Sequence, residues 1–250
     1  MPSTMAPPVS VADPILRASC YELLAHSFAY PDEERLADLR DAAEEVLKSK
    51  EASIPFMRLA AIAREIGREA LEPVHVSLIT FSSSPDCPAF ESAYLGGDAQ
   101  RQTQRMADIA GFYHAFGVDT AEGAYRPDDL SVELGFMGFL CRKEAYALEH
   151  LGPPRARQAH KAQRTFLENH LGTWAIVFGR KFASQAPAGH FYALAGTALA
   201  DWVEGECEEA GIQPQQVSAD AAHTWPLPAS HGPEFAGDAS FVPLEELAER

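Results

Sequence analysis

The chain has 250 residues, of which 46% are hydrophobic and 22% are charged, a composition typical of a soluble globular protein. The 20 basic residues stand against 36 acidic residues, which gives a formal net charge of −16 at pH 7. This charge repels nucleic-acid phosphates and attracts basic ligands, or simply keeps the protein dissolved. No apolar run approaches the roughly 20 residues that a membrane helix needs, so we expect neither nucleic-acid binding nor stable membrane insertion.

The N-terminal residues and the cysteines indicate a cytoplasmic protein without a metal centre. Residues 1–13 are rich in Pro, Ser and Ala and lack the basic start and apolar core of a secretory signal. The four cysteines are far apart and share no CxxC spacing, which favours neither a zinc site nor a disulfide framework. No pair of histidines has the helical spacing, with a glutamate, of a zinc hydrolase. A reducing cytoplasm fits best.

Apolar residues recur with helical periodicity through most of the chain, which predicts an all-α fold. Asp32 is a predicted N-cap, Pro73 a predicted stop, and Gly117 and Gly211 are predicted C-caps. The expected helices run from Pro14 to before Tyr30-Pro31, then over about 33–48, 54–71, 98–116, 130–150, from about 157 through Phe182, and over about 187–210. In the helix that begins near 157, Gly172 and Gly179 are candidate break points.

Two segments carry weaker signals. Val74 to Thr80 alternates like a short strand, but the sequence offers no partner strand, so we interpret it as a helix end or an extended segment. The proline-rich residues after Ile212 are expected to be extended or partly disordered, up to a short helix at about Leu244 to Glu249. We therefore expect a flexible N-terminus (1–13), a single-domain helical bundle (14–211) and a proline-rich C-terminal tail (212–250).

The most organised part of the sequence lies between Cys87 and Glu149. It contains the segment Cys87–Tyr94 (CPAFESAY), the helical segment Met106–Gly117 (MADIAGFYHAFG), and the turn Arg126–Asp129 (RPDD), after which a long apolar helix begins. No metal-ligand set, phosphate loop or nucleophile motif interrupts this region. An organised region without reactive groups favours a surface that holds another polypeptide.

These segments, together with His170-Leu171-Gly172-x-Trp174 and Phe191–Ala195, resemble the TorD-like chaperones that mature molybdenum enzymes of the DMSO reductase family. The resemblance extends over roughly Leu16 to Gly211, and the run Ser84–Pro88 is most similar to chaperones of the type II enzymes. In two places the sequence departs from the family pattern. Asp129 stands where the family often has His, and Ala89 where it often has Pro.

The resemblance implies an all-helical fold, no catalysis and no cofactor of the chain's own. It implies that the protein binds the immature catalytic subunit of a molybdopterin-containing oxidoreductase, often through its twin-arginine signal peptide. It also implies that the protein protects this immature subunit, its client, while the molybdopterin cofactor is inserted into the client and before the client is exported. The protein itself is expected to be a monomer or a homodimer.

A twin-arginine signal joins a basic start to an apolar, helix-capable stretch, so its receptor needs an apolar groove with carboxylates at the rim. In the simplest alternative, Glu91 caps a helix or pairs with a nearby arginine, and Asp128 and Asp129 cap the following helix. For Tyr113 and Phe136, the sequence favours a place in the core over a place in the groove. The candidate binding residues are Phe90, Glu91, Tyr94, Tyr113, Arg126, Pro127, Asp128, Asp129 and Phe136.

Two further acidic residues are expected to be structural. Asp108 is interpreted as a buried hydrogen-bond partner inside its helix, and Glu133 as a residue that pins neighbouring helices. A small helical enzyme that uses these two carboxylates is an alternative, although the sequence offers them no base or metal partner. A regulatory adaptor that binds a basic protein is another.

Overall fold

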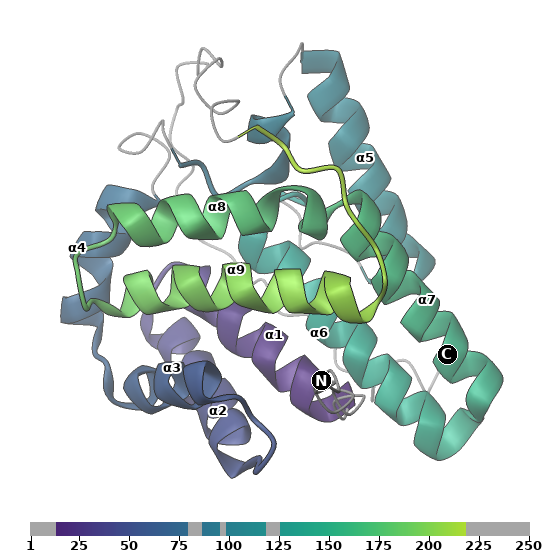
Figure 1. The fold of residues 1–250 in the computed structure, drawn as a ribbon, viewed down its shortest axis with the longest axis horizontal. Coiled ribbons are helices and arrows are strands. Elements are labelled where there is room, and N and C mark those ends of the chain that lie inside the picture. Colours follow the sequence, from purple (N-terminus) through teal and green to yellow (C-terminus); the bar gives the residue numbers. More distant parts are fainter. Residues whose placement is uncertain (1–13, 80–86, 96–98, 119–125, 219–250) are drawn as a thin grey trace, which may run out of the picture.

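The computed structural model describes residues 14–79, 87–95, 99–118 and 126–218, which form the helical bundle drawn in Figure 1. These ranges contain no β-strand, only an isolated antiparallel bridge between Phe90 and Asp129. The all-α prediction is confirmed. The elements are α1 (Pro14–Phe28), α2 (Glu33–Lys48), α3 (Ile54–Glu65), α4 (Arg68–Leu78), the 3₁₀ turn η1 (Glu91–Tyr94), α5 (Ala99–Ala115), α6 (Leu130–Tyr146), the π turn η2 (Ala147–Leu151), α7 (Pro153–Asn169), α8 (Leu171–Gln185) and α9 (Phe191–Glu209).

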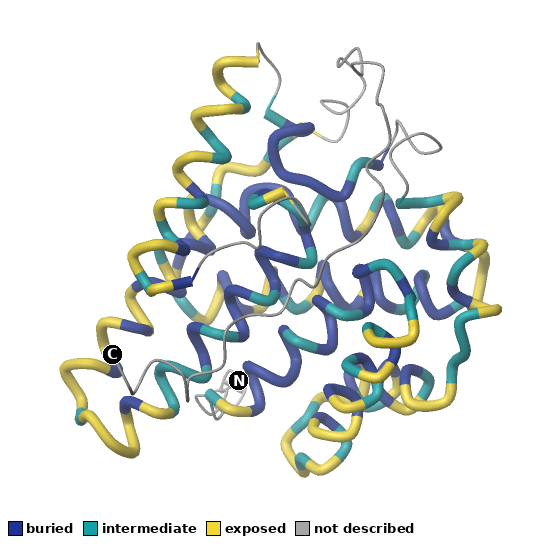
Figure 2. Tube along the Cα trace, turned by 180° about the vertical axis from the view of Figure 1, so that it is seen from behind, coloured by how far each residue is buried: buried dark blue, intermediate teal, exposed yellow. Residues whose placement is uncertain are grey.

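Helices α1 and α6 form the centre of the bundle. Eleven of the fifteen residues of α1 are buried, and α6 buries residues on more than one side, as its sequence predicts. The two helices pack extensively against each other, and α8 and α9 form an antiparallel pair that covers them (Figure 1). The burial pattern in Figure 2 follows this order, because the buried residues concentrate on the inner helices. A helix that is apolar on several sides needs neighbours all around it.

The α8–α9 pair depends on two glycines that face each other. A Cβ atom added to Gly179 would lie 2.7 Å from the carbonyl oxygen of Gly196, and one added to Gly196 would lie 2.9 Å from the carbonyl oxygen of Gly179. Only glycine permits this approach of two helix backbones. The close pairing holds α8, and thus the residues that it contributes to the candidate site, firmly against the bundle.

The predicted third helix was wrong at its C-terminal end. Ile66 is extended, with φ −72° and ψ 139°, and Gly67 is the N-cap of a new helix, so the chain forms α3 and α4 instead of one helix. Pro73 lies inside α4 and does not end it. The strand-like residues Val74–Leu78 continue α4, which confirms the interpretation as a helix end.

The helix predicted from about 157 through Phe182 is two helices. The chain breaks at His170, with φ −128° and ψ −99°, and not at either glycine that the sequence suggested. Helix α7 begins at Pro153 because proline is well suited to the first helical position, where its missing N–H costs nothing. Helix α9 begins at Phe191, four residues after the predicted start, since the side chain of His190 caps it.

Several predicted boundaries are confirmed. Asp32 accepts a hydrogen bond from the backbone N–H of Arg35 at the start of α2. Gly117 and Gly211 have φ of 73° and 63° after α5 and α9, as C-cap glycines require. The C-terminal helix expected at about 244–249 and the N-terminal segment 1–13 lie outside the described residues.

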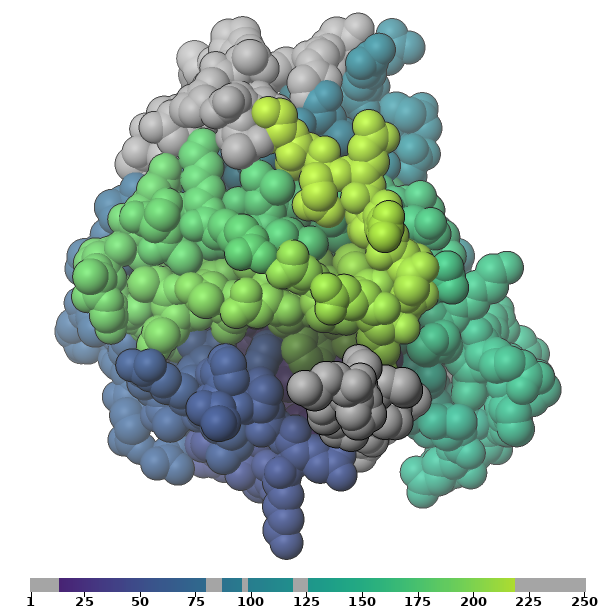
Figure 3. Space-filling view, viewed as in Figure 1, coloured from purple at the N-terminus to yellow at the C-terminus, as the bar shows by residue number. Residues whose placement is uncertain are grey.

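Residues Ile212–Ser218 are not helical and run across α8 (Figure 3). The backbone N–H of Val217 donates to the carbonyl of Thr173 at 2.9 Å, and the side chain of Gln216 donates to the carbonyl of Gly172 at 2.7 Å. Among the described residues, no helix has both the length and the apolar character needed to cross a bilayer.

Candidate functional site

The two motifs that surround the candidate site are joined by backbone hydrogen bonds. The N–H of Glu91 donates to the carbonyl of Asp128 at 2.9 Å, and the N–H of Leu130 donates to the carbonyl of Ala89 at 2.9 Å. These bonds fix η1 against the turn that opens α6. The hydroxyl of Tyr113 in α5 donates to the carbonyl of Pro127 at 2.7 Å, which adds the third predicted motif. The structure therefore brings the separate motifs of the sequence into one place.

Glu91 lies at the centre of the site and is completely buried. Its Oε1 accepts hydrogen bonds from Arg105 of α5, with the Nε donor at 2.8 Å. Its Oε2 lies 3.3 Å from Nδ1 of His170, and the hydroxyl of Thr173 is 3.4 Å from Oε1. A buried carboxylate needs such partners, because an isolated charge would be very costly there. Glu91 therefore pairs with an arginine, Arg105, as the simplest alternative in the sequence analysis expected.

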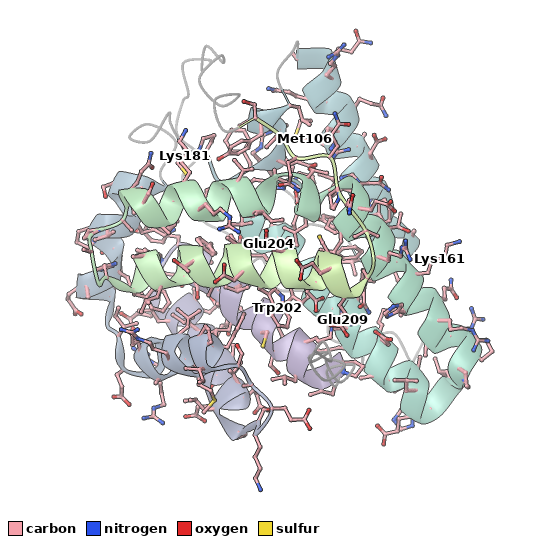
Figure 4. All side chains as sticks on the ribbon, in the orientation of Figure 1. Met106, Lys161, Lys181, Trp202, Glu204 and Glu209 are labelled. Atoms are coloured by element: carbon pink, nitrogen blue, oxygen red, sulfur yellow. The ribbon has the colours of Figure 1, made fainter. Side chains whose placement is uncertain are left out.

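Asp128 is also completely buried and belongs to a second ion pair. Its Oδ1 accepts from Nε of Arg126 at 2.9 Å, and its Oδ2 accepts from the backbone N–H of Ser92 at 3.0 Å. The Arg126 guanidinium also donates to the Ser92 hydroxyl at 2.8 Å and lies 4.3 Å from the centre of the Phe90 ring. The Arg126 side chain is 41% exposed, so this pair lies at the edge of the site. Its Nη2 is 3.4 Å from the sulfur of Met106, which is labelled in Figure 4.

Asp129 is the N-cap of α6. Its Oδ1 accepts hydrogen bonds from the backbone N–H of Ser131 at 2.9 Å and from the Ser131 hydroxyl at 2.6 Å. Burial raises the pKa of Asp129 to about 6, although the bonds from Ser131 oppose the shift. The capping role that the sequence allowed is present, and a binding role in addition stays a prediction.

Glu133 connects two helices, as expected. It is completely buried, and its Oε2 accepts a hydrogen bond from the indole Nε1 of Trp174 in α8 at 3.2 Å. Burial, and after it the negative charge of Glu91, raises the pKa of Glu133 well above its usual range.

The four predicted apolar residues pack into the core beside these carboxyl groups. Phe90, Tyr94, Tyr113 and Phe136 are all buried. The ring centroids of Tyr113 and Phe136 are 4.6 Å apart, and those of Tyr94 and Trp174 are 5.4 Å apart. In this structure these four residues form part of the core and do not line an open groove. A place in the core is the alternative that the sequence favoured for Tyr113 and Phe136.

The prediction for Asp108 was wrong. Asp108 is exposed and accepts a hydrogen bond from Gln104, one turn earlier in the same helix, at 2.9 Å. Helix α5 buries only Ile109 and Tyr113, so the face that carries Asp108 is in contact with water. Asp108 and Glu133 therefore do not share a pocket, which removes the structural basis of the alternative enzyme.

The sequence analysis missed three residues that complete the site, namely Arg105, His170 and Thr173. Arg105 lies in the segment just before the Met106 motif, and His170 opens the motif that ends at Trp174. A basic residue near several acidic motifs was the only available signal. Within the described residues, no group of three His, Cys, Asp or Glu side chains could hold a metal ion.

Comparison with known proteins places this arrangement in a family. The model of the nitrate reductase delta subunit family matches residues 25–179, which include all the site residues described above. The chain belongs to the nitrate reductase delta subunit family. This family contains the TorD-like assembly chaperones, so the resemblance drawn from the motifs is confirmed, and its members are chaperones rather than catalysts.

Three relatives within this family have names that describe assembly chaperones. The perchlorate reductase assembly chaperone protein of Dechloromonas aromatica is 28% identical over 72% of this chain and 84% of its own length. The selenate reductase assembly chaperone protein of Thauera selenatis is 29% identical over 83% of this chain and 96% of its own. The chlorate reductase assembly chaperone protein of Ideonella dechloratans is 26% identical over 82% and 95%.

A solved structure supports the fold alone. The crystal structure of a candidate redox enzyme maturation protein from Archaeoglobus fulgidus superposes with a TM-score of 0.51. The match covers 75% of this chain and 93% of the other, at 21% sequence identity. At this level of identity the helical architecture is shared, whereas the chemistry of the site must be argued from this chain's own residues.

Proposed function

We propose that this protein is an assembly chaperone for the catalytic subunit of a molybdopterin-containing oxidoreductase. It binds the immature subunit, including a twin-arginine signal peptide, and shields it until the cofactor has been inserted, which delays export. The observation that carries the proposal is the family match together with the relatives named for perchlorate, selenate and chlorate reductases. The protein acts by binding and release and makes no covalent bond.

The chemistry of the candidate site supports a basic ligand. Burial, and after it the negative charges of four carboxyl groups, raises the pKa of Tyr113; these groups are Glu133, Asp128, Glu91 and Asp129. The net charge of −16 adds long-range attraction for a positively charged segment. Charge-assisted bonds from arginine to carboxylate are strong and directional, which suits recognition of two adjacent arginines.

The direct test is a calorimetric titration of the full chain with a synthetic peptide in which two adjacent arginines precede an apolar stretch. A second peptide carries glutamines in place of both arginines. We expect the arginine peptide to bind at least tenfold more tightly, because only it supplies guanidinium donors. Equal affinity for the two peptides would reject recognition of the arginine pair.

Variants of the protein locate the binding site. We expect Glu91→Gln and Asp128→Asn each to weaken binding of the arginine peptide while leaving the glutamine peptide unaffected. Glu204→Gln is the matched control, since Glu204 is an exposed carboxylate on α9 that pairs with Arg180 at 2.7 Å (Figure 4). If the control variant loses as much affinity as the other two, general charge attraction explains the binding.

The client itself is tested by affinity capture of the tagged full chain from cells that are making a molybdenum oxidoreductase. We expect an immature catalytic subunit, free of its cofactor, to be recovered. Recovery of a mature basic regulator in its place would favour the adaptor alternative.

A further inference from the structure

Helix α5 is held to the bundle by few apolar contacts. Of its 17 residues only Ile109 and Tyr113 are buried, and its first two turns carry mostly exposed polar side chains. In Figure 1 this outer half extends beyond the neighbouring helices, and Figure 2 shows it exposed from the opposite side. By contrast α1, of similar length, buries eleven residues. Helices with little buried apolar surface are the ones that separate most easily from a fold.

Arg105 provides the charged attachment of α5 to the bundle. It acts beside two neutral hydrogen bonds, from Tyr113 to the Pro127 carbonyl at 2.7 Å and from Gln102 to the Ser92 carbonyl at 3.4 Å. The Arg105 guanidinium donates to the carboxylate of Glu91 and to the carbonyl oxygen of Asn169 at the end of α7. The Glu91 carboxylate is fully buried, whereas the Arg105 side chain is 21% exposed. The acidic member of the pair thus belongs to the rigid bundle, and the basic member belongs to the loosely packed helix.

The surroundings of Glu91 suit a guanidinium group. His170 and Thr173 contact the carboxylate from α8 and its cap, and the Asn169 carbonyl provides a further acceptor for the same guanidinium. Behind Glu91, the completely buried Glu133 has an Oε1 atom without a hydrogen-bond partner among the described residues. Buried polar atoms of this kind are rare in folded proteins.

Helix α5 also covers aromatic side chains. Phe112 packs on Phe166 and His170 with centroid distances of 5.5 Å and 5.3 Å, and Tyr113 packs on Phe136. Phe136 and Phe166 are completely buried beneath these contacts. If α5 moved away, the carboxylate of Glu91 and the adjoining rings of Phe136 and Phe166 would become accessible together. These are the two features that a basic, apolar peptide needs.

We propose that Arg105 is an internal substitute for a client arginine, and that an incoming client guanidinium replaces it on Glu91 and releases α5. This inference rests on the proposed function and deepens it. It accounts for the burial of Glu91 and Phe136, because Arg105 and Tyr113 of α5 contact these two side chains in the free protein. Because the internal ion pair must be exchanged, peptides without an arginine cannot open the site, which gives selectivity in addition to affinity.

The first experiment needs no ligand. Amide hydrogen exchange is measured across α5 in the wild type and in Arg105→Gln, with Arg157→Gln as the charge-matched control. Arg157 is an exposed residue of α7. We expect exchange within α5 to accelerate at least tenfold in Arg105→Gln and not in the control. Unchanged exchange would overturn the proposal, because Arg105 would then not hold α5 in place.

The second experiment titrates the same three proteins with the synthetic arginine peptide. We expect Arg105→Gln to bind it at least fivefold more tightly than the wild type and the control, because no internal guanidinium competes. Equal or weaker binding overturns the proposal, and weaker binding would mean that Arg105 contacts the client. If none of the proteins binds the peptide although α5 is released in Arg105→Gln, the proposed function fails and the competition fails with it.

A conservative variant covers the case in which Arg105→Gln is poorly folded. Arg105→Lys keeps the positive charge and loses the forked donor geometry. We expect exchange rates and peptide affinity between those of the wild type and Arg105→Gln. If the exchange rate or the peptide affinity of Arg105→Lys did not fall between those of the wild type and Arg105→Gln, a simple competition between two guanidinium groups would be contradicted.

Discussion

Arg17 of α1 and Glu206 of α9 form a buried ion pair that ties the centre of the bundle to its outer layer. Nε of Arg17 lies 3.0 Å from Oε1 of Glu206, and the hydroxyl of Tyr21 donates to Oε2 at 2.9 Å. Burial opposes the charge of Arg17, but the hydrogen bond to Glu206 and the electrostatic interactions with neighbouring groups together raise the pKa of Arg17 above its usual value.

Removing one member of this pair leaves the other charged and buried. We therefore expect Glu206→Leu to lower the free energy of unfolding by roughly 3–5 kcal/mol, measured by urea denaturation. The double variant Arg17→Met with Glu206→Leu is expected to recover most of the loss, since apolar residues of similar volume replace a buried pair well. Additive losses in the double variant would show that the two residues do not depend on each other.

The facing glycines of α8 and α9 predict a steric effect. In Gly179→Ala the new methyl group would lie 2.7 Å from the carbonyl oxygen of Gly196, so the helices must separate. We expect a loss of about 1–3 kcal/mol in unfolding free energy. Gly205→Ala on α9 is the control, because its methyl group meets no atom within 4 Å, and it should gain up to about 1 kcal/mol. Similar effects of the two substitutions would contradict the close approach.

His75 predicts a loss of stability in acid. It is buried, with Nε2 at 3.3 Å from the carbonyl oxygen of Phe28, and burial lowers its pKa to about 4. The unfolded chain takes up the proton near pH 6.5 and the folded chain only near pH 4, so folding loses free energy as the pH falls through this window. The loss from this group is about 3 kcal/mol. His75→Gln should lack this part of the pH dependence when unfolding is compared at pH 7 and pH 4. If the unfolding free energies of the wild type and His75→Gln fell equally from pH 7 to pH 4, this role of His75 would be disproved.

Asp129 predicts a pH dependence of the opposite sign. Its folded pKa is raised to about 6 by burial, above the ordinary value of 3.8. The stability that this group contributes is present below pH 3.8 and is lost as the pH rises through about 6. The effect is at most about 3 kcal/mol, less where solvent reaches the carboxylate. Asp129→Asn keeps a good N-cap and should remove this dependence, measured as the difference in unfolding free energy between the two proteins from pH 4 to pH 7. A constant difference would contradict the raised pKa.

The sequence was sufficient to predict those helix ends that depend only on residues close by in the chain. The caps Asp32, Gly117 and Gly211 act within a few residues of the helices that they start or end, and they were predicted correctly. Pro73 misled the prediction because a proline in an otherwise favourable sequence can be accommodated inside a helix, at the cost of one backbone hydrogen bond. The break at His170 was also missed, since its ring is drawn toward Glu91, 79 residues earlier.

The structure brings the predicted site residues together, whereas the partners that surround them were not predicted. The motifs pointed to Glu91 and Asp128, but pairing with Arg105 and Arg126 depends on how α5 and the turn meet. Burial of Phe136 under α5 depends on the packing of three helices, which periodicity alone does not describe. Asp108 shows the same limit, because its helix proved to be mostly exposed.

The segment Ile212–Ser218, which crosses α8, offers a position for a fluorescent label close to the candidate site. Val217 is bonded to the carbonyl of Thr173, whose hydroxyl approaches Glu91, so a fluorophore on a cysteine at Ser218 would sit near the carboxylates. The four native cysteines are buried, and burial raises the pKa of Cys20 to about 12 and that of Cys207 to about 11. Thiol reagents should therefore label the introduced cysteine selectively, and peptide arrival could be followed in real time without modifying any of the residues that receive it.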